Sequence, residues 1–201
     1  GKHAVGRVIA RPFVGEFPNF KRTANRHDFS LEPPEITMLD QLANSGKDVI
    51  AVGKIVDIFA GRGVTDFVQT KDNNDGIERT LEIMKMEFEG LCFVNLVDFD
   101  MVYGHRNDVD GYARALANFD KALEGIIRNL KNDDLLMITA DHGCDPGDIS
   151  TDHSREYTPL LMYGNSLRNN VNLGTRGTFS DIGATILDYF GIEKKINGES
   201  M

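Results

Sequence analysis

The sequence predicts an α/β protein in which a mostly parallel sheet is flanked by helices. Apolar runs of strand length alternate along the chain with longer stretches whose apolar residues recur at helical spacing. One run, "LCFVNLVDF" at residues 91–99, is nearly continuous, which is typical of a strand covered on both faces. With 201 residues, the chain is long enough to bury a sizeable core.

The predicted elements follow one another from residue 33 to residue 191. Helices are expected between Pro33 and Gly46, at residues 76–89, at residues 109–130, and from a Ser180 N-cap to a stop at Gly191. Strands are expected at residues 47–55, 91–99, 133–141 and 158–164, and a glycine- and aspartate-rich loop at residues 60–75. Strands that alternate with helices in this way indicate crossover connections and therefore parallel pairing.

Residues 1–31 differ from the rest of the chain. They hold six arginines or lysines, four phenylalanines and only two acidic residues, and prolines interrupt them. A short strand around Val8 and Ile9 is the only regular element that this segment predicts. Its basic, aromatic, proline-broken character is that of the end of a separate part of a larger protein, so we expect a boundary between residues 1–31 and residues 32–201.

The composition argues against two classes of partner. The net charge of −9 would repel a nucleic-acid backbone, and it favours divalent cations instead. No apolar run approaches the roughly 20 residues that span a bilayer, so no membrane contact is expected. Two cysteines, Cys92 and Cys144, are too few for a disulfide framework and indicate a reducing compartment, the cytoplasm.

Acidic residues and histidines follow the ends of two predicted strands. Because parallel strands end at one edge of a sheet, we expect five side chains to meet there: Asp100, His105, Asp141, His142 and His153. Any one aspartate on its own would be interpreted as a solvated surface residue. Three of the five histidines in the chain fall in this set, however, which favours a metal site.

The donor set suggests the kind of metal and the number of ions. Carboxylates with imidazoles suit Mn, Zn or Fe better than Ca or structural zinc. A single catalytic metal usually takes three protein ligands, so five indicate two ions, which could act together at phosphorus. Cys144 is interpreted as a turn residue, and Asp98, two residues before Asp100, as a support for the ligands. Lys54 is interpreted equally well as a phosphate contact or a solvated lysine.

Four stretches of the sequence resemble one enzyme family. The segments "NLVDFDMVYGHRNDVDGYARAL", "ITADHGCDPGD", "TDHSREYTPLL" and "GKHAVGRVIARPFVGE" are similar to the phosphopentomutase family of the alkaline phosphatase superfamily. Members of this family interconvert ribose 1-phosphate, or its deoxy form, with the 5-phosphate. The resemblance extends over essentially the whole chain, and the "TDHSREYTPLL" stretch discriminates best within the superfamily.

The resemblance implies a role for each candidate residue. Asp100, His105 and His153 would hold one Mn ion, and Asp141 and His142 would contribute to a second. Arg7, at the end of a cap domain formed in part by residues 1–31, and Lys54, in the core domain of residues 32–201, would contact a sugar phosphate.

The resemblance also implies parts that have no counterpart here. The family's first metal-binding aspartate, its phosphorylated threonine nucleophile and most of its cap domain would precede Gly1. We therefore expect the 201 residues alone to be inactive. Two alternatives stay open: another phosphomutase or phosphodiesterase of the superfamily, such as a cofactor-independent phosphoglycerate mutase, and a non-catalytic metal-binding domain.

Overall fold

The computed structural model describes residues 5–23 and 27–201, and the chain folds into two compact units. Unit 1 is formed by Gly1–Phe67, Glu89–Phe93 and Arg176–Met201, and unit 2 by Val68–Phe88 and Val94–Thr175. Each unit therefore combines segments that are distant in the sequence. The boundary expected after residue 31 falls inside unit 1, and the division into a cap segment and a core domain stays a prediction.

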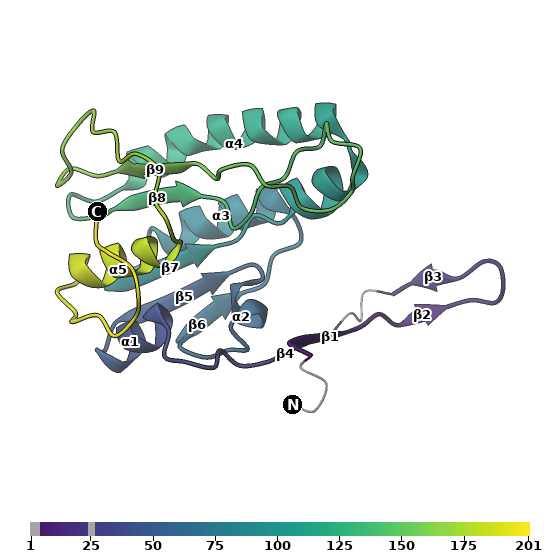
Figure 1. Ribbon diagram of the computed structural model, residues 1–201, viewed down its shortest axis with the longest axis horizontal. Helices are drawn as coiled ribbons and strands as arrows, with labels where there is room; N and C mark the ends of the chain where they lie inside the picture. The colour runs from purple at the N-terminus through teal and green to yellow at the C-terminus, as the bar shows by residue number, and fades with distance from the viewer. Residues whose placement is uncertain (1–4, 24–26) are drawn as a thin grey trace. The chain divides into compact units, whose positions relative to one another are not determined.

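Unit 1 contains a three-stranded sheet in the order β6, β5, β7, whose arrows point the same way in Figure 1. The elements of this part are α1 (Met38–Asn44), β5 (Asp48–Val52), α2 (Ile55–Ile58), β6 (Asp66–Val68), β7 (Gly90–Val94) and α5 (Ser180–Tyr189). The last residues of β6 and β7 already belong to unit 2. Parallel strands connected through helices confirm the predicted α/β class.

The core of unit 1 lies where α1, α2 and α5 pack on β5. Leu39, Leu42, Val49 and Leu187 have no exposed surface. Each buried leucine contributes about 1.5–3 kcal/mol relative to an exposed one, so these few side chains account for much of the stability of the unit.

Helix α1 begins with a capping box. The Thr37 hydroxyl accepts a hydrogen bond from the backbone N–H of Asp40, and the Asp40 carboxylate accepts one from the backbone N–H of Thr37, at 3.2 and 2.6 Å. Arg62 Nε lies 2.9 Å from the other carboxylate oxygen. Burial acts to raise the pKa of Asp40, but the hydrogen bonds from Thr37 and Arg62 outweigh it and leave this pKa below its ordinary value.

We expect Thr37→Ala to lower the free energy of unfolding by about 1 kcal/mol, because the cap of α1 loses its acceptor. Urea unfolding at pH 7 measures the change. Thr37→Ser keeps the hydroxyl and is expected to lose only a fraction of this; equal losses in the two variants would contradict the capping role.

The stabilisation by Asp40 depends on pH. Since the pKa of Asp40 is lowered in the folded protein, its contribution to the free energy of unfolding is present above the ordinary carboxyl pKa. This contribution is lost as the pH falls through the folded pKa.

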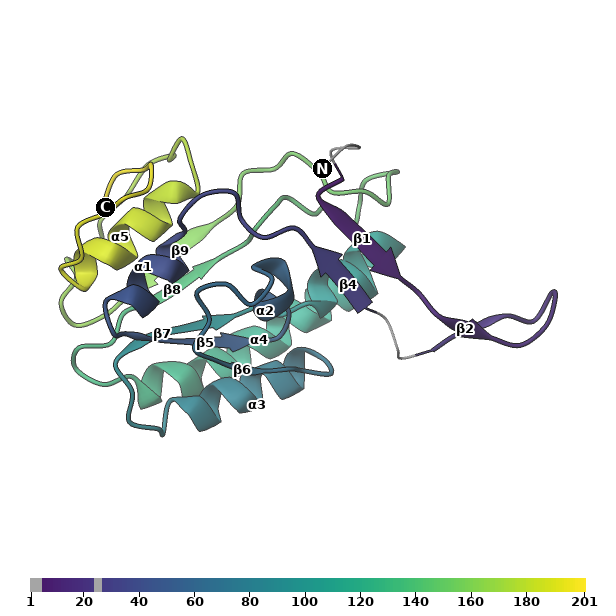
Figure 2. The same ribbon diagram turned by 90° about the horizontal axis from the view of Figure 1, so that it is seen from below.

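The amino-terminal part of unit 1 forms two antiparallel strand pairs. Strand β1 (Arg7–Ala10) pairs with β4 (His27–Ser30), and β2 (Phe13–Val14) pairs with β3 (Lys21–Arg22). Figure 2 shows β1 and β4 side by side. Strand β1 includes the apolar residues from which a strand was predicted. Phe13, Phe17 and Phe20 are more than half exposed, so this segment has little core of its own.

Unit 2 is built on two long helices and one strand pair. Its elements are α3 (Asn73–Ile83), the π-helical turn η1 (Phe99–Tyr103), the 3₁₀ turn η2 (Gly104–Arg106), α4 (Val109–Asn129), β8 (Leu136–Thr139) and β9 (Leu160–Tyr163). Helices α3 and α4 are in contact, and β8 pairs with β9 in antiparallel register. Within the described residues, no helix is both long and apolar enough to cross a membrane.

Several predicted elements differ from the structure. The helix expected at residues 76–89 spans Asn73–Ile83, and the strands expected at residues 133–141 and 158–164 pair antiparallel and not parallel. The run predicted as a strand to residue 99 leaves the sheet after Val94 and turns into η1. The loop predicted at residues 60–75 contains the short strand β6, which has too few residues to show a period. Ser180 is the first residue of α5 and not its N-cap; Phe179 occupies that position, and the Thr178 hydroxyl accepts the Ser180 N–H instead.

Candidate metal centre

Asp100 lies on η1, six residues beyond the end of β7, and not at the strand end where the sequence placed it. The turn that carries it is fixed by Asp98. The backbone N–H of Asn73 donates to the Asp98 carboxylate at 2.8 Å, and the backbone N–H of Asp98 donates to the Asn73 side chain at 2.9 Å. This reciprocal pair joins the start of η1 to the first residue of α3. Asp98 thus supports the segment that bears Asp100, as its position in the sequence suggested.

His105 lies on η2 and points its Nε2 atom at Asp100. The distance from Nε2 to Asp100 Oδ1 is 3.3 Å. Its other nitrogen, Nδ1, is hydrogen-bonded to the carbonyl oxygen of Thr151. A carbonyl can only accept, so Nδ1 carries the proton, and in the neutral ring the Nε2 lone pair faces Asp100.

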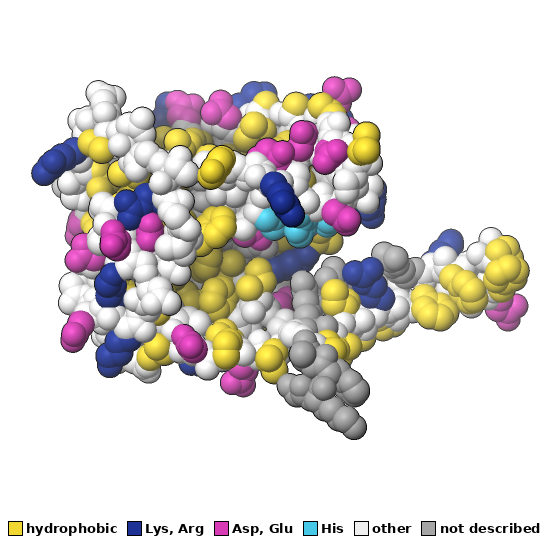
Figure 3. Space-filling view, in the orientation of Figure 1, with side chains coloured by type: hydrophobic (Ala, Val, Ile, Leu, Met, Phe, Trp, Pro, Cys, Tyr) yellow, Lys and Arg dark blue, Asp and Glu magenta, His cyan; other side chains and the backbone are white. Residues whose placement is uncertain are grey.

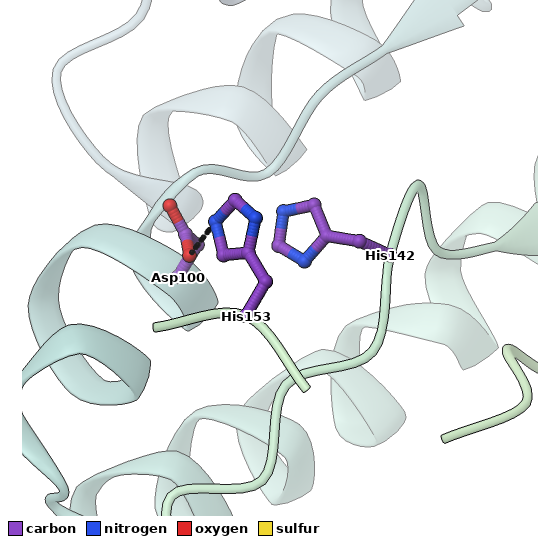
Figure 4. Close-up of side chains that lie close together, drawn as sticks. All are labelled: Asp100, His142 and His153. Carbon is purple, nitrogen blue, oxygen red and sulfur yellow. Dashed lines mark ion pairs between the residues drawn. The ribbon is translucent and has the colours of Figure 1, made fainter. Parts of the chain in front are cut away.

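His153 reaches Asp100 from the loop that connects β8 to β9. Its Nε2 atom also lies 3.3 Å from Asp100 Oδ1 (Figure 4). The loop is folded back on itself by an antiparallel bridge between Gly143 and Ser154, in which the Ser154 N–H donates to the Gly143 carbonyl at 3.1 Å. This bridge places the residues just before it, His142 and His153, next to each other.

His142 stacks on His153, and Asp141 lies beside His142 without joining the donor group of Asp100, His142 and His153. The two imidazole rings are 3.5 Å apart between centroids and 14° from parallel. One donor atom each from Asp100, His142 and His153 lies within 4.8 Å of the others. The Asp141 side chain is 72% exposed and lies 3.6 Å from His142 Nε2. The predicted pairing of Asp141 with His142 on a second ion stays a prediction.

The arrangement around Asp100 fits a bound cation. Asp100 Oδ1 is buried and accepts no hydrogen bond in the described structure. The Nε2 lone pair of a neutral His105 faces this oxygen and would repel it unless a positive charge lay between them. Asp100 Oδ1 lies 3.3 Å from the Nε2 atoms of both His105 and His153, a spacing at which these three donor atoms could hold one metal ion together.

The cluster is open to solvent on one side. The exposed fractions of the His105, His142 and His153 side chains are 35%, 26% and 49%. Figure 3 shows histidine side chains at the surface with acidic side chains nearby. A metal ion held here could therefore keep a coordination position for a ligand from solution.

The pKa values of both cysteines are raised above the ordinary thiol value. Burial raises the pKa of Cys144, and the neighbouring carboxylates, Asp100 first among them, raise it further. Burial alone raises the pKa of Cys92, in β7, to about 11. The raised pKa values favour the protonated thiol at both positions, and the interpretation of Cys144 as a turn residue stays a prediction.

Two further residues, Arg7 and Lys54, were predicted to contact a phosphate group. Arg7 is in β1, and its side chain is outside the described part of the structure. Lys54 belongs to unit 1, where it is the residue before α2. Their contact with a phosphate stays a prediction for both.

Comparison with known proteins bears on this donor cluster. The sequence model described as the metalloenzyme superfamily matches residues 14–194. The chain belongs to the metalloenzyme superfamily. A metal cofactor follows from this membership together with the Asp100, His142 and His153 group.

Relatives within the superfamily cover the whole chain. The chain is 65% identical over 200 residues to the phosphopentomutase of Lachnoclostridium phytofermentans. The match covers 100% of this chain and 51% of that protein. The phosphopentomutase of Acetivibrio thermocellus is 60% identical, with 100% and 52% covered. The chain thus spans about half the length of the curated relatives it matches.

A solved structure shares the fold of this chain. The PH0037 protein from Pyrococcus horikoshii superposes with a TM-score of 0.62, covering 89% of this chain and 59% of that one. At 15% identity this likeness bears on the fold alone.

Some residues that shape this candidate site were not predicted from the sequence. Gly143 allows the two halves of the β8–β9 loop to touch, Asn73 holds Asp98, and Asn107 binds the far part of the same loop. The Gly after "ADH" was the only available signal, because glycine permits close backbone approach. The two asparagines act on partners 25 or more residues away, which no local pattern indicates.

Proposed function

We propose that the chain carries metal-binding residues of a phosphopentomutase, which interconverts ribose 1-phosphate, or its deoxy form, with the 5-phosphate through a phosphoenzyme. The observation that carries the proposal is the identity of 56–65% to proteins named phosphopentomutase along 96–100% of this chain. The donor cluster supports it, since the chemistry requires cations beside the transferred phosphoryl group.

The proposed cofactor is a pair of Mn ions. When bound, the ions would neutralise phosphate charge and activate an oxygen for in-line displacement. Asp100, His105 and His153 would hold one ion, and Asp141 and His142 would contribute to the other. The carbonyl of Thr151 keeps the proton of His105 on Nδ1, which leaves Nε2 available as a ligand. A mixture of carboxylate and imidazole donors suits Mn.

The proposed partner is a small sugar phosphate. Arg7 and Lys54 would contact its phosphate group, and the net charge of −9 argues against a nucleic acid as substrate. Because both cysteines are free, we also propose a reducing compartment, the cytoplasm. We further propose that these 201 residues made alone bind metal without turnover, because the family's threonine nucleophile has no counterpart among them.

Substrate choice tests the proposed function. Ribose 1-phosphate and 2-phosphoglycerate are supplied separately to the intact protein loaded with Mn. We expect isomerisation of the pentose phosphate only, and its loss in His153→Ala, while Arg128→Ala, an exposed change on α4, leaves the rate unchanged. Turnover of 2-phosphoglycerate would instead support the phosphoglycerate mutase alternative, and metal binding without any turnover would support a non-catalytic domain.

A further inference from the structure

Asn107 connects the two segments that deliver histidines to Asp100. It follows η2, which bears His105, and it has left-handed backbone angles, φ 52° and ψ 32°. Its side chain extends across to the β8–β9 loop, more than 40 residues further along the chain. There it lies close to the segment that ends at His153.

This connection consists of three hydrogen bonds. Their donors are the side chains of His105 and Asn107, and their acceptors are three backbone carbonyls within residues 148–151. The Asn107 Nδ2 group donates to the carbonyl oxygens of Asp148 and of Ser150, the latter at 3.1 Å. His105 Nδ1 donates to the carbonyl of Thr151. Both partners of Asn107 are acceptors, so the amide must present its NH₂ group to them. The contact is therefore directional and cannot be replaced by a carboxylate.

The β8–β9 loop needs such an attachment. Residues 140–159 contain no strand, and Ile149 at the loop tip is fully exposed, so little apolar packing holds this part in place. The Gly143–Ser154 bridge fixes the base of the loop, whereas the Asn107 bonds fix residues 148–150. His153 lies between these two attachments.

We propose that Asn107 is a positioning residue that latches the loop to η2, so that His105 and His153 meet at the same oxygen of Asp100. Asn107 does not itself contact a metal-ligating atom. It restricts the conformations of His153 before metal binds, so less conformational entropy is lost on binding. This rests on the proposed function only in so far as the cluster binds a divalent cation. Loss of supporting hydrogen bonds around a metal site typically lowers affinity by about 10-fold to 100-fold, and we expect a loss in that range here.

Three variants separate the latch from the backbone role of Asn107. Asn107→Gly keeps access to the left-handed angles but removes the amide, and Asn107→Asp keeps the shape but removes both donors. Asn170, another left-handed asparagine of unit 2 with φ 57°, supplies the matched control Asn170→Gly. Mn affinity is measured by calorimetry on the intact protein, and hydrogen exchange follows the amides of residues 149–153 in the metal-free state.

We expect both Asn107 variants to bind Mn about 10-fold or more weakly and to exchange the loop amides faster, while Asn170→Gly binds as the unchanged protein does. Wild-type Mn affinity in both Asn107 variants would overturn the latch, and so would an affinity loss that Asn170→Gly shares. Failure of the unchanged protein to bind Mn would overturn the latch and the metal assignment together. Lack of ribose 1-phosphate turnover, with these affinities as expected, would overturn the phosphopentomutase proposal alone.

Discussion

Replacing Gly143 with alanine is expected to separate the two halves of the β8–β9 loop and to weaken metal binding strongly. A Cβ atom at this position would lie 2.6 Å from the carbonyl oxygen of Ser154 and 2.8 Å from the backbone nitrogen of Glu156. Both are backbone atoms, so no side-chain rotation relieves the clash. The backbone must move apart at the bridge that brings His142 and His153 together.

The expected change in stability is a loss of about 1–3 kcal/mol in the free energy of unfolding, the usual range for overpacking in a tight contact. Metal affinity should fall further than in the Asn107 variants, because the base of the loop moves and not only its tip. Urea unfolding of the metal-free protein and Mn calorimetry measure the two quantities. Both effects have the same origin, so they should appear together.

Gly147 provides the matched control in the same loop. A Cβ there would lie 3.1 Å from the Asp145 carboxylate oxygen, which accepts the Gly147 N–H and need move by only a few tenths of an ångström to make room. We expect Gly147→Ala to change Mn affinity and stability little. Unchanged Mn binding in Gly143→Ala would show that the close contact with Ser154 is not needed to hold the histidines.

The sequence predicted the parts of the fold that repeat a local pattern. Helix α4 was predicted at its observed position because its apolar stripe continues over six turns, and β5 because its apolar run lies between polar residues. Strand β6, at three residues, is shorter than the window in which any period can be recognised. Its place is fixed by pairing with β5, which is tertiary information.

In the candidate site, too, local sequence patterns indicated some residues, whereas contacts between distant residues could not be predicted. Asp100, His105 and His153 could be selected because acids and histidines cluster after apolar runs, and the structure brings these three side chains together. Their precise delivery depends on contacts between distant residues. Asp98 with Asn73, and Asn107 with Ser150, are pairs 25 and 43 residues apart, so the sequence alone gave no reason to associate them.

Changing Asp100 to asparagine is expected to remove most of the metal affinity while leaving the metal-free protein at least as stable. Within the described part of the chain, Asp100 Oδ1 is a buried oxygen that accepts no hydrogen bond, which is unfavourable for a charged group. The neutral amide is less costly to bury. With metal, however, the carboxylate is the only anionic donor within 3.3 Å of both His105 Nε2 and His153 Nε2 in the described structure. Removing the Asp100 carboxylate should lower the Mn affinity by more than the roughly 100-fold that loss of a supporting hydrogen bond can cause.

Thermal or urea unfolding with and without Mn measures this change directly. At free Mn 100 times the dissociation constant, binding stabilises the unchanged protein by about 2.7 kcal/mol, and a 100-fold loss of affinity reduces that gain to about 0.4 kcal/mol. The control variant Asp152→Asn removes one charge from the exposed loop beside His153. We expect Mn to stabilise this variant as strongly as the unchanged protein. An Asp100→Asn protein that Mn still stabilises as strongly as the unchanged protein would exclude Asp100 as a ligand. A fall in metal-free stability would show that His105 and His153, as charged partners of Asp100, already stabilise the cluster without metal.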